Sequence, residues 1–176
     1  AGATYFSNFA VDSARHLTDF ITLTFNPRII LLRTDNSGLA IEAPVSLRTK
    51  QNEHNTAHFA VHLPLLVTYS IGAGAGGYSE EALKKKLGIT AGLGWGYFFQ
   101  RTESAKDAYS RFNEKLETSG PEIQFGFLTP LKRKLYLFDR DNPLDVMLAI
   151  KGNYLINTQK RNYNIGALSV LLDFHF

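Results

Sequence analysis

Residues 87–100, LGITAGLGWGYFFQ, decide the fold of this chain. Apolar side chains occupy every second position, and glycine fills four of the positions between them, Gly88, Gly92, Gly94 and Gly96. Successive side chains of a β-strand point to opposite faces, so the stretch predicts a strand with one apolar face and one nearly bare face. Glycine weakens a strand on a solvent-exposed sheet. The bare face therefore favours the interior of a narrow closed barrel, where it leaves room for longer side chains from across the lumen.

The same period of two runs along most of the chain. It predicts strands at 18–33, 39–48, 58–72, 87–100, 121–138, 144–157 and 162–176, with an interruption at Pro27 and a bulge or break in TPLKRK, 129–134. TYFSNFAV at 4–11 is a candidate eighth strand, TDNSG at 34–38 predicts a tight turn, and SEEALKKKL at 79–87 predicts a short helix. We expect one all-β domain over residues 1–176, a closed antiparallel up-and-down transmembrane β-barrel of about eight strands.

The second face of these strands decides between a soluble barrel and a membrane barrel. It carries glycine, alanine, serine and threonine rather than the lysine and glutamate that a water-exposed sheet presents. The apolar faces are therefore expected to look outward into lipid, and most strands exceed the roughly nine residues that span a bilayer. Aromatic residues gather near strand ends, as in an interfacial girdle: Phe59, Tyr69, Trp95, Tyr97, Phe99 and Tyr154. The alternative is a soluble lipocalin-like or sandwich domain.

Composition excludes several other classes of protein. With 44% apolar residues among 176, disorder is excluded, and no apolar run reaches the roughly eighteen residues of a membrane-spanning helix. The net charge of +3 is dispersed over the chain, which argues against a nucleic-acid partner. Cysteine is absent, so disulfides and cysteine-based metal sites are excluded. The chain opens on AGATYF without Met, which fits either a removed signal peptide or a trimmed chain.

The last stretch, ALSVLLDFHF at 167–176, carries a family resemblance. Its alternate residues Leu168, Val170, Leu172, Phe174 and Phe176 form one apolar face, and this pattern resembles the C-terminal β-signal of bacterial outer-membrane β-barrels. FNPRIILL, DNSG and PVSLR resemble small outer-membrane barrels of Bacteroidota more loosely. The resemblance implies insertion into the bacterial outer membrane by the barrel assembly machinery, with both termini periplasmic. It implies no particular activity.

That orientation predicts which connections face which compartment. The turns at 34–38 and 139–143 are expected in the periplasm, and the segments 49–57, 102–120 and 157–162 outside the cell. The segment 102–120 is long and charged, so we expect a large outer loop there. The segment 73–86 is an unusually long periplasmic connection, either a docking element or a solvated helical turn.

Charged residues on the inward face predict a polar network inside the barrel. They are Arg28, Glu42, Arg48, His58, His62, Lys151 and Asp173, together with Lys132, Lys134, Asp145 and His175. Arg28 and Glu42 lie at matching distances from the tight turn, so they can pair. The network fits either a plugged barrel or a narrow, positively lined water pathway.

Two histidines are candidate metal ligands or catalytic groups. His58 and His62 share a face but lie about 13 Å apart along a strand, too far for one metal ion. His58 is expected near the outer rim of the barrel. A histidine at this level resembles the arrangement in lipid A-modifying outer-membrane enzymes, whose catalytic groups lie at the same level. Neither Ser46 nor Ser70 is placed beside it by the sequence, and no hydrolase, zinc-protease or nucleotide-binding motif occurs. We therefore predict no catalytic residue, no metal and no cofactor.

The function expected from the sequence is structural. We predict a membrane anchor or accessory subunit of a membrane protein complex, in contact with outer-membrane lipid or lipopolysaccharide and with a protein partner. The alternatives are a lipid A-modifying enzyme and a narrow pore.

Overall fold

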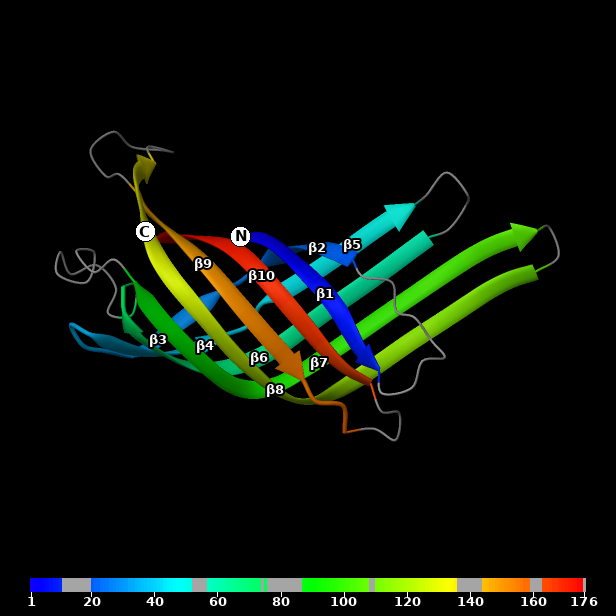
Figure 1. Ribbon diagram of the computed structural model, residues 1–176, viewed down its shortest axis with the longest axis horizontal. Coiled ribbons are helices and arrows are strands. Elements are labelled where there is room, and N and C mark those ends of the chain that lie inside the picture. The colour runs from blue at the N-terminus through cyan, green and yellow to red at the C-terminus, as the bar shows by residue number, and fades with distance from the viewer. Residues whose placement is uncertain are drawn as a thin grey trace.

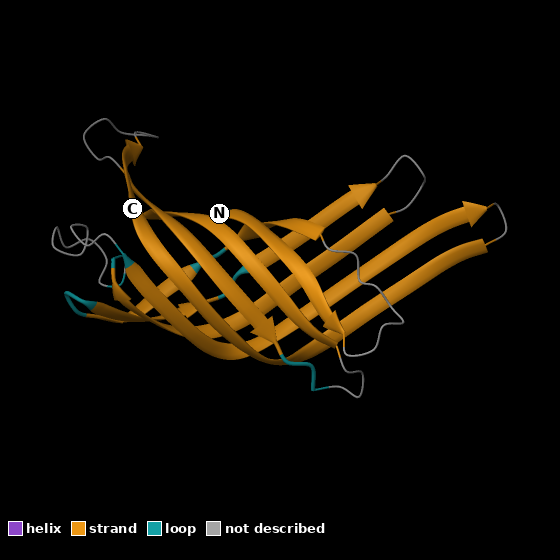
Figure 2. Ribbon diagram, viewed as in Figure 1, coloured by secondary structure: helices purple, strands orange, loops and turns teal. Residues whose placement is uncertain are grey.

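The computed structural model describes residues 1–10, 20–51, 57–73, 75, 87–107, 110–135, 144–158 and 163–175 (Figure 1). They form β1 (Gly2–Ala10), β2 (Phe20–Phe25), β3 (Arg28–Arg33), β4 (Ser37–Glu42), β5 (Val45–Gln51), β6 (Ala57–Gly72), β7 (Gly88–Asp107), β8 (Ser110–Leu135), β9 (Leu144–Leu155) and β10 (Tyr163–His175). Strands account for nearly all of these residues (Figure 2). In this part of the chain, no helix has the length and apolar character needed to cross a membrane.

The strands close into an antiparallel barrel. Their neighbour order is β3-β4-β6-β5-β2-β1-β10-β9-β8-β7, and the pairing of β6 with β7 closes the ring. β2 and β3 are two halves of one barrel strand, as are β4 and β5, because the register that pairs Phe25 with Val45 continues unchanged to Arg28 and Glu42. Across the interruption, the Ala43 amide donates to the Pro27 carbonyl at 3.1 Å. The described residues thus make eight barrel strands, and the predicted fold is confirmed, with 4–11 contained largely in β1.

The two faces of the sheet divide as the period of two predicts. Large apolar side chains on the outside are exposed, Leu23 to 79% and Phe125 to 65%, whereas Thr22, Gly92 and Gln124 on the opposite face are buried. Val146, expected on the apolar outer face, is an exception because it is 5% exposed. It lies at the end of β9, where the β8–β9 register shifts between Pro130 and Lys134. That shift confirms the bulge predicted within 129–134.

The glycines of β7 make room for neighbouring strands. A Cβ at Gly96 would lie 2.0 Å from Oε2 of Glu122 on β8 and 3.0 Å from a methyl of Leu155 on β9. A Cβ at Gly92 would lie 2.8 Å from a methyl of Thr68 on β6. We expected these glycines to make room for side chains from the opposite wall of the barrel. That expectation was wrong, because the nearest side chains belong to β6 and β8, which flank β7, and to β9, which follows β8.

The two ends of the barrel differ. We name one end the terminal end, because it holds Ala1, the 34–36 turn and the carboxyl-terminal end of β10. There the Thr34 hydroxyl closes a short turn: it accepts a hydrogen bond from the Ser37 amide and donates one to the Ser37 carbonyl. Gly72 has a φ of 87°, a conformation that suits glycine, and the chain after it turns inward so that Ala73 is fully buried. The predicted turn at 139–143 and, apart from Leu87, the predicted helix at 79–87 lie outside the described residues.

At the opposite end, which we name the hairpin end, β7 and β8 run far past the other strands. Arg101 pairs with Lys115, and pairing continues to Asp107 and Ser110. The expected outer loop at 102–120 is therefore wrong, because most of this segment is strand. Figure 1 shows the β5–β6 and β7–β8 pairs extending together beyond the end of β1, β9 and β10. The barrel thus continues on one side as a four-stranded sheet.

Candidate functional site

The barrel interior is the candidate site, and its centre is an ion-pair cluster around Glu42. This carboxylate is 1% exposed. Its Oε2 accepts from Nζ of Lys151 at 2.6 Å and from Nδ2 of Asn26 at 3.1 Å, and its Oε1 lies 3.7 Å from Nε of Arg28. Thr68 donates to Oε1 at 3.3 Å. Because an unpaired buried charge is expensive, the cations and hydrogen bonds together make Glu42 tolerable inside the barrel.

The Glu42–Lys151 pair crosses the lumen. Going round the ring from β4, the strands β6, β7 and β8 come before β9, so the two residues stand on opposite walls of the barrel. The short distance between Nζ and Oε2 therefore braces the two walls across the interior. A charge-assisted hydrogen bond of this kind is among the stronger polar contacts in proteins.

A second polar centre surrounds Glu122. Its Oε2 lies 2.9 Å from Nε2 of His62, and its Oε1 accepts from Nδ2 of Asn153 at 2.6 Å. His62 is on β6 and Glu122 on β8, so the contact passes over β7 at Gly96, which has no side chain to block it. Phe6 packs edge-on against the imidazole, with ring centroids 5.2 Å apart and planes at 80°.

A chain of hydroxyl groups joins the strands that close the barrel. Thr4 on β1 shares hydrogen bonds with Thr24 on β2 at 2.5 Å and with Ser169 on β10 at 2.9 Å. Thr24 continues the chain to Ser46 on β5 at 2.8 Å. Each bond replaces one that the hydroxyl would make to water, so these buried polar groups can line the interior without a large penalty.

Apolar side chains fill the barrel on both sides of the polar layer. Toward the hairpin end, a buried cluster is formed by Phe6, Ala60, Phe98, Leu155 and Ile165. Toward the terminal end, the buried cluster is formed by Ala73, Leu128, Met147, Ala149 and Leu171. A cavity among the polar residues, lined by Ser46, His62 and Lys151 among others, has a volume of about 10 Å³. That is about the least volume that can hold one water molecule.

The structure places four of the interior residues expected from the sequence in the two polar clusters. Arg28, Glu42 and Lys151 meet in one cluster, and His62 lies in the other. Arg48 is half-buried on the inner face of β5. The side chains of His58, Lys132, Lys134, Asp145, Asp173 and His175 lie outside the described part.

Sequence reasoning missed Glu122 and Asn153. The signal for Glu122 was present, since it alternates with the outward residues Ile123 and Phe125 and therefore belongs to the inner face. Asn153 alternates in the same way with Tyr154 and Gly152.

The serine nearest to His62 in the sheet register is engaged in the chain of hydroxyl groups. Ser46 lies opposite His62 in the β5–β6 register, but its hydroxyl is hydrogen-bonded to Thr24. In the same part of the chain, no group of three histidine, aspartate or glutamate side chains is placed to hold a metal ion. The arrangement of the interior favours support of the barrel walls.

The outer face is a continuous apolar surface with aromatic residues toward its edges. Phe59, Tyr69, Trp95 and Tyr154 are exposed there, while Tyr97 and Phe99 are half-buried. The rings of Phe59 and Phe99 lie 6.1 Å apart, and Lys115 lies over the Phe99 ring with Nζ 5.4 Å from its centroid. Beyond this level, a hydrogen bond to Glu117 raises the pKa of the Lys115 ammonium. Both side chains are exposed, so the pair contributes little to stability.

These features define the class of protein. A closed barrel leaves no unpaired sheet edge in lipid, its outer face is apolar, and its interior is polar at mid-depth. The chain is an integral β-barrel of the bacterial outer membrane. The residues Leu168, Val170 and Leu172 of the last strand belong to its exposed apolar face, while the side chain of Phe174 and all of Phe176 lie outside the described part.

Comparisons with known proteins agree on the fold. The chain is similar to two crystal structures of Ail, the attachment invasion locus protein of Yersinia pestis, one of them in complex with the heparin analogue sucrose octasulfate. Both have a TM-score of 0.61, with 9% and 8% sequence identity, and cover 99% of this chain and 94% of Ail. No protein-family model matches the chain. No curated protein matches it either.

Proposed function

We propose that this protein is a structural or accessory anchor that holds a partner protein at the cell surface through its projecting sheet. The observation that carries the proposal is the contrast between a filled, cross-braced lumen and a sheet that continues past the barrel. The Glu42–Lys151 pair and the two apolar clusters fill the interior. The stem of the β7–β8 hairpin offers backbone and side chains outside the membrane.

The orientation is part of the proposal. Outer-membrane barrels have short periplasmic turns and longer extracellular extensions. The short turn at 34–36 is at the terminal end and the long strands are at the hairpin end. The hairpin end then faces outward, and both termini face the periplasm.

The docking surface is the part of β8 that passes the end of β9. In the described residues, β9 pairs with β8 from Glu122 onward, and backbone bonds from Ile156 and Thr158 extend this to Ser119. Residues 110–118 of β8 pair with β7, and at about 3.4 Å per residue they make about 30 Å of sheet. An edge of this kind can add a strand from another protein. Ail is an attachment protein by name, but no ligand is transferred from it, because a shared fold does not imply a shared ligand.

A trimmed hairpin tests the proposal. Residues 102–114 are replaced by an Asn-Gly turn, which joins the paired residues Arg101 and Lys115. We expect pull-down from a detergent extract of the native cells to recover a partner with the wild type and to lose it with the trimmed variant. A control exchanges 52–56 for glycine and serine and should retain the partner. Recovery of the same partner by the trimmed protein would show that the hairpin is not the docking site.

The proposal assigns no enzymatic activity. His62 and Glu122 are buried, with Phe6 and Phe98 packed toward the hairpin end, so an outer-leaflet lipid does not reach them. Lipid A from cells lacking the protein is expected to have an unchanged mass spectrum. A missing modification that returns on complementation would favour the lipid A-modifying alternative.

We further propose that the last stretch of the sequence carries the assembly signal, at its alternate residues Leu168, Val170, Leu172, Phe174 and Phe176. We also propose that the protein comes from a member of the Bacteroidota. β10 pairs with β1, which joins the first and last strands of the chain within the ring, and assembly must complete this step. Phe176→Ala is expected to reduce the amount of folded protein in the outer membrane, measured by heat-modifiable gel mobility, whereas Phe59→Ala should not reduce it as much. Equal amounts of the two variants would argue against the signal.

A further inference from the structure

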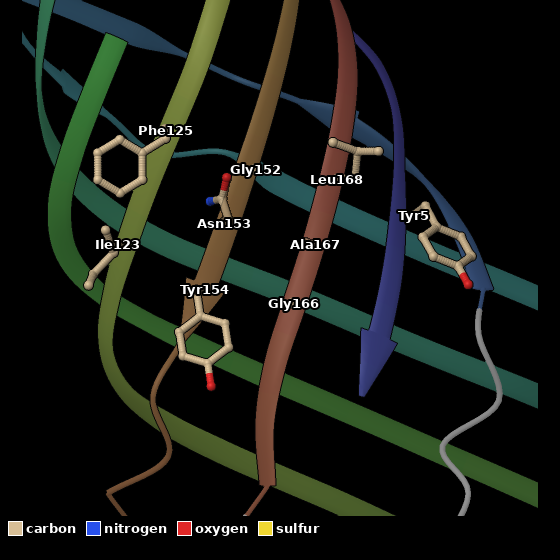
Figure 3. A pocket seen from close by; sticks show the side chains of 9 residues that line it. All are labelled: Tyr5, Ile123, Phe125, Gly152, Asn153, Tyr154, Gly166, Ala167 and Leu168. Carbon is tan, nitrogen blue, oxygen red and sulfur yellow. The ribbon is translucent and has the colours of Figure 1, made fainter. Parts of the chain in front are cut away.

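The outer face carries an apolar groove across β8, β9, β10 and β1. Figure 3 shows bare ribbon at Gly152 and Gly166 between Ile123 and Phe125 on one side and Leu168 and Tyr5 on the other. Its volume is about 630 Å³, within the range of roughly 300–1,000 Å³ typical of small-molecule sites. The groove is therefore larger than the gaps between ordinary side chains.

The sheet register explains the hollow. One outward row runs Phe125, Gly152, Leu168 and Tyr5 across four neighbouring strands. The next row places Ile123 and Tyr154 beside Gly166. The two glycines are thus diagonal neighbours, and the side chains missing from them leave one continuous depression. A Cβ at Gly152 would lie 3.9 Å from the carbonyl oxygen of Phe125, an ordinary van der Waals contact, so a side chain can be accommodated there.

One end of the groove is polar. The Tyr154 hydroxyl accepts a hydrogen bond from Nδ2 of Asn164 at 2.8 Å, and Oδ1 of Asn164 accepts from the Asn157 amide at 3.2 Å. These bonds hold the Tyr154 ring in place beside Gly166. Tyr154 and Asn164 lie toward the hairpin end, so the groove has an apolar body at mid-depth and a polar end at the membrane interface.

We propose that this groove binds one acyl chain of lipid A, the lipid of the outer leaflet, in a fixed position. The groove is continuous with the lipid-facing surface, where Phe127, Ile150 and Val170 are also exposed, so its occupant is a hydrocarbon chain. Its polar end faces the outer leaflet in the orientation given above, and the inference rests on that orientation but not on the docking role of the hairpin. The hydroxyl and amide groups of Tyr154 and Asn164 lie where the chain joins its polar head group.

Filling the groove tests the proposal. In Gly152→Leu, the new side chain is introduced into the acyl site, and its Cβ would make an ordinary contact of 3.9 Å with the Phe125 carbonyl oxygen. Val67→Phe adds the same number of side-chain carbons to the outer face of β6, away from the groove, and is the control. Each purified, folded protein is titrated in detergent with lipid A, and in a parallel arm with phosphatidylethanolamine, and bound lipid is counted by native mass spectrometry.

We expect wild type and Val67→Phe to bind one lipid A with equal affinity and Gly152→Leu to bind roughly tenfold more weakly, since a few methylenes lose their site. Phosphatidylethanolamine should bind weakly and equally to all three. Equal lipid A affinity of Gly152→Leu and wild type overturns the proposal. A loss in Gly152→Leu that is the same for phosphatidylethanolamine overturns the assignment to lipid A. Circular dichroism and heat-modifiable mobility establish that each variant is folded, and neither result depends on recovery of a protein partner.

Discussion

Gly96 lies directly beneath the carboxylate of Glu122: a Cβ at this position would be 2.0 Å from Oε2, the same oxygen that lies 2.9 Å from Nε2 of His62. The contact between β6 and β8 thus depends on an absent side chain on β7. Two strands apart in a sheet is roughly 10 Å, which the two side chains can bridge because nothing stands between them.

Gly96→Ala is expected to separate Glu122 from His62. The methyl group displaces the carboxylate, and a buried acceptor and ring nitrogen lose their partner, at a cost of about 1–3 kcal/mol in the free energy of unfolding. Urea unfolding in detergent micelles, followed by circular dichroism, measures the change. Gly152→Ala is the matched control, since its methyl would come no nearer than 3.9 Å to the Phe125 carbonyl oxygen, and it should stay within about 0.5 kcal/mol of wild type. If both alanines have the same small effect, Gly96 is not needed for the His62–Glu122 contact.

Lys151→Met should be the more damaging change. It leaves Glu42 buried with Arg28 at 3.7 Å as its remaining cation, and breaking a buried pair from one side costs about 3–5 kcal/mol. Adding Glu42→Gln to this variant removes the stranded charge, so the double variant is expected to be more stable than Lys151→Met alone. The unfolding free energies of wild type, both single variants and the double variant form the cycle that measures the coupling. Additive effects would show that the pair does not act as a unit.

The filled lumen predicts the absence of ion conductance. Purified protein reconstituted into planar bilayers should give no stepwise current, because apolar clusters and the polar layer occupy the interior. Phe98→Ala removes one of the two rings from the hairpin-end cluster but leaves the Glu42–Lys151 brace, so it should also be silent. Defined single-channel steps from the wild type would revive the narrow-pore alternative.

A charge on the outer face reports membrane depth. Leu93 on β7 is 66% exposed on the apolar surface, and Leu93→Arg is expected to cost about 2–4 kcal/mol if this surface lies at mid-bilayer. Leu93→Met keeps the apolar surface and should fold as wild type does. Folding yield into lipid vesicles of both variants, measured over a urea series, gives the comparison. Equal stability of Arg and Met at this position would contradict burial in lipid.

Features of the structure that depend on local geometry could be predicted from the sequence, and contacts between distant strands could not. The faces of the strands follow from alternation alone, and Leu23, Phe125 and Leu168 are outward as the period requires. The nearness of Arg28 and Glu42 was also predictable to within one residue from the short 34–36 turn, and a register shift between Ile30 and Leu32 places the two residues directly opposite each other. Local geometry determines both results.

Contacts between distant strands were beyond prediction. Lys151 reaches Glu42 because the ring closes with β4 and β9 on opposite walls, and nothing local to either strand determines that closure. The strands of the β7–β8 hairpin were not predicted for a different reason. Its charged sequence at 102–120 is typical of a loop, but a strand outside the membrane is free to be polar on both faces. The charged residues of segment 102–120 therefore indicate exposure to water and do not indicate that a strand is absent.

The sheet of β5, β6, β7 and β8 rises past the barrel on one side, while β1, β9 and β10 stop short of it (Figure 1). Such a molecule has a front and a back within the plane of the membrane. A neighbour diffusing toward β1 and β10 approaches the side on which the strands end first, whereas one approaching β6 and β7 meets a sheet that projects past the barrel. A symmetric cylinder looks the same after rotation about the membrane normal. This molecule does not, so its rotational orientation determines which of its sides a neighbouring protein contacts.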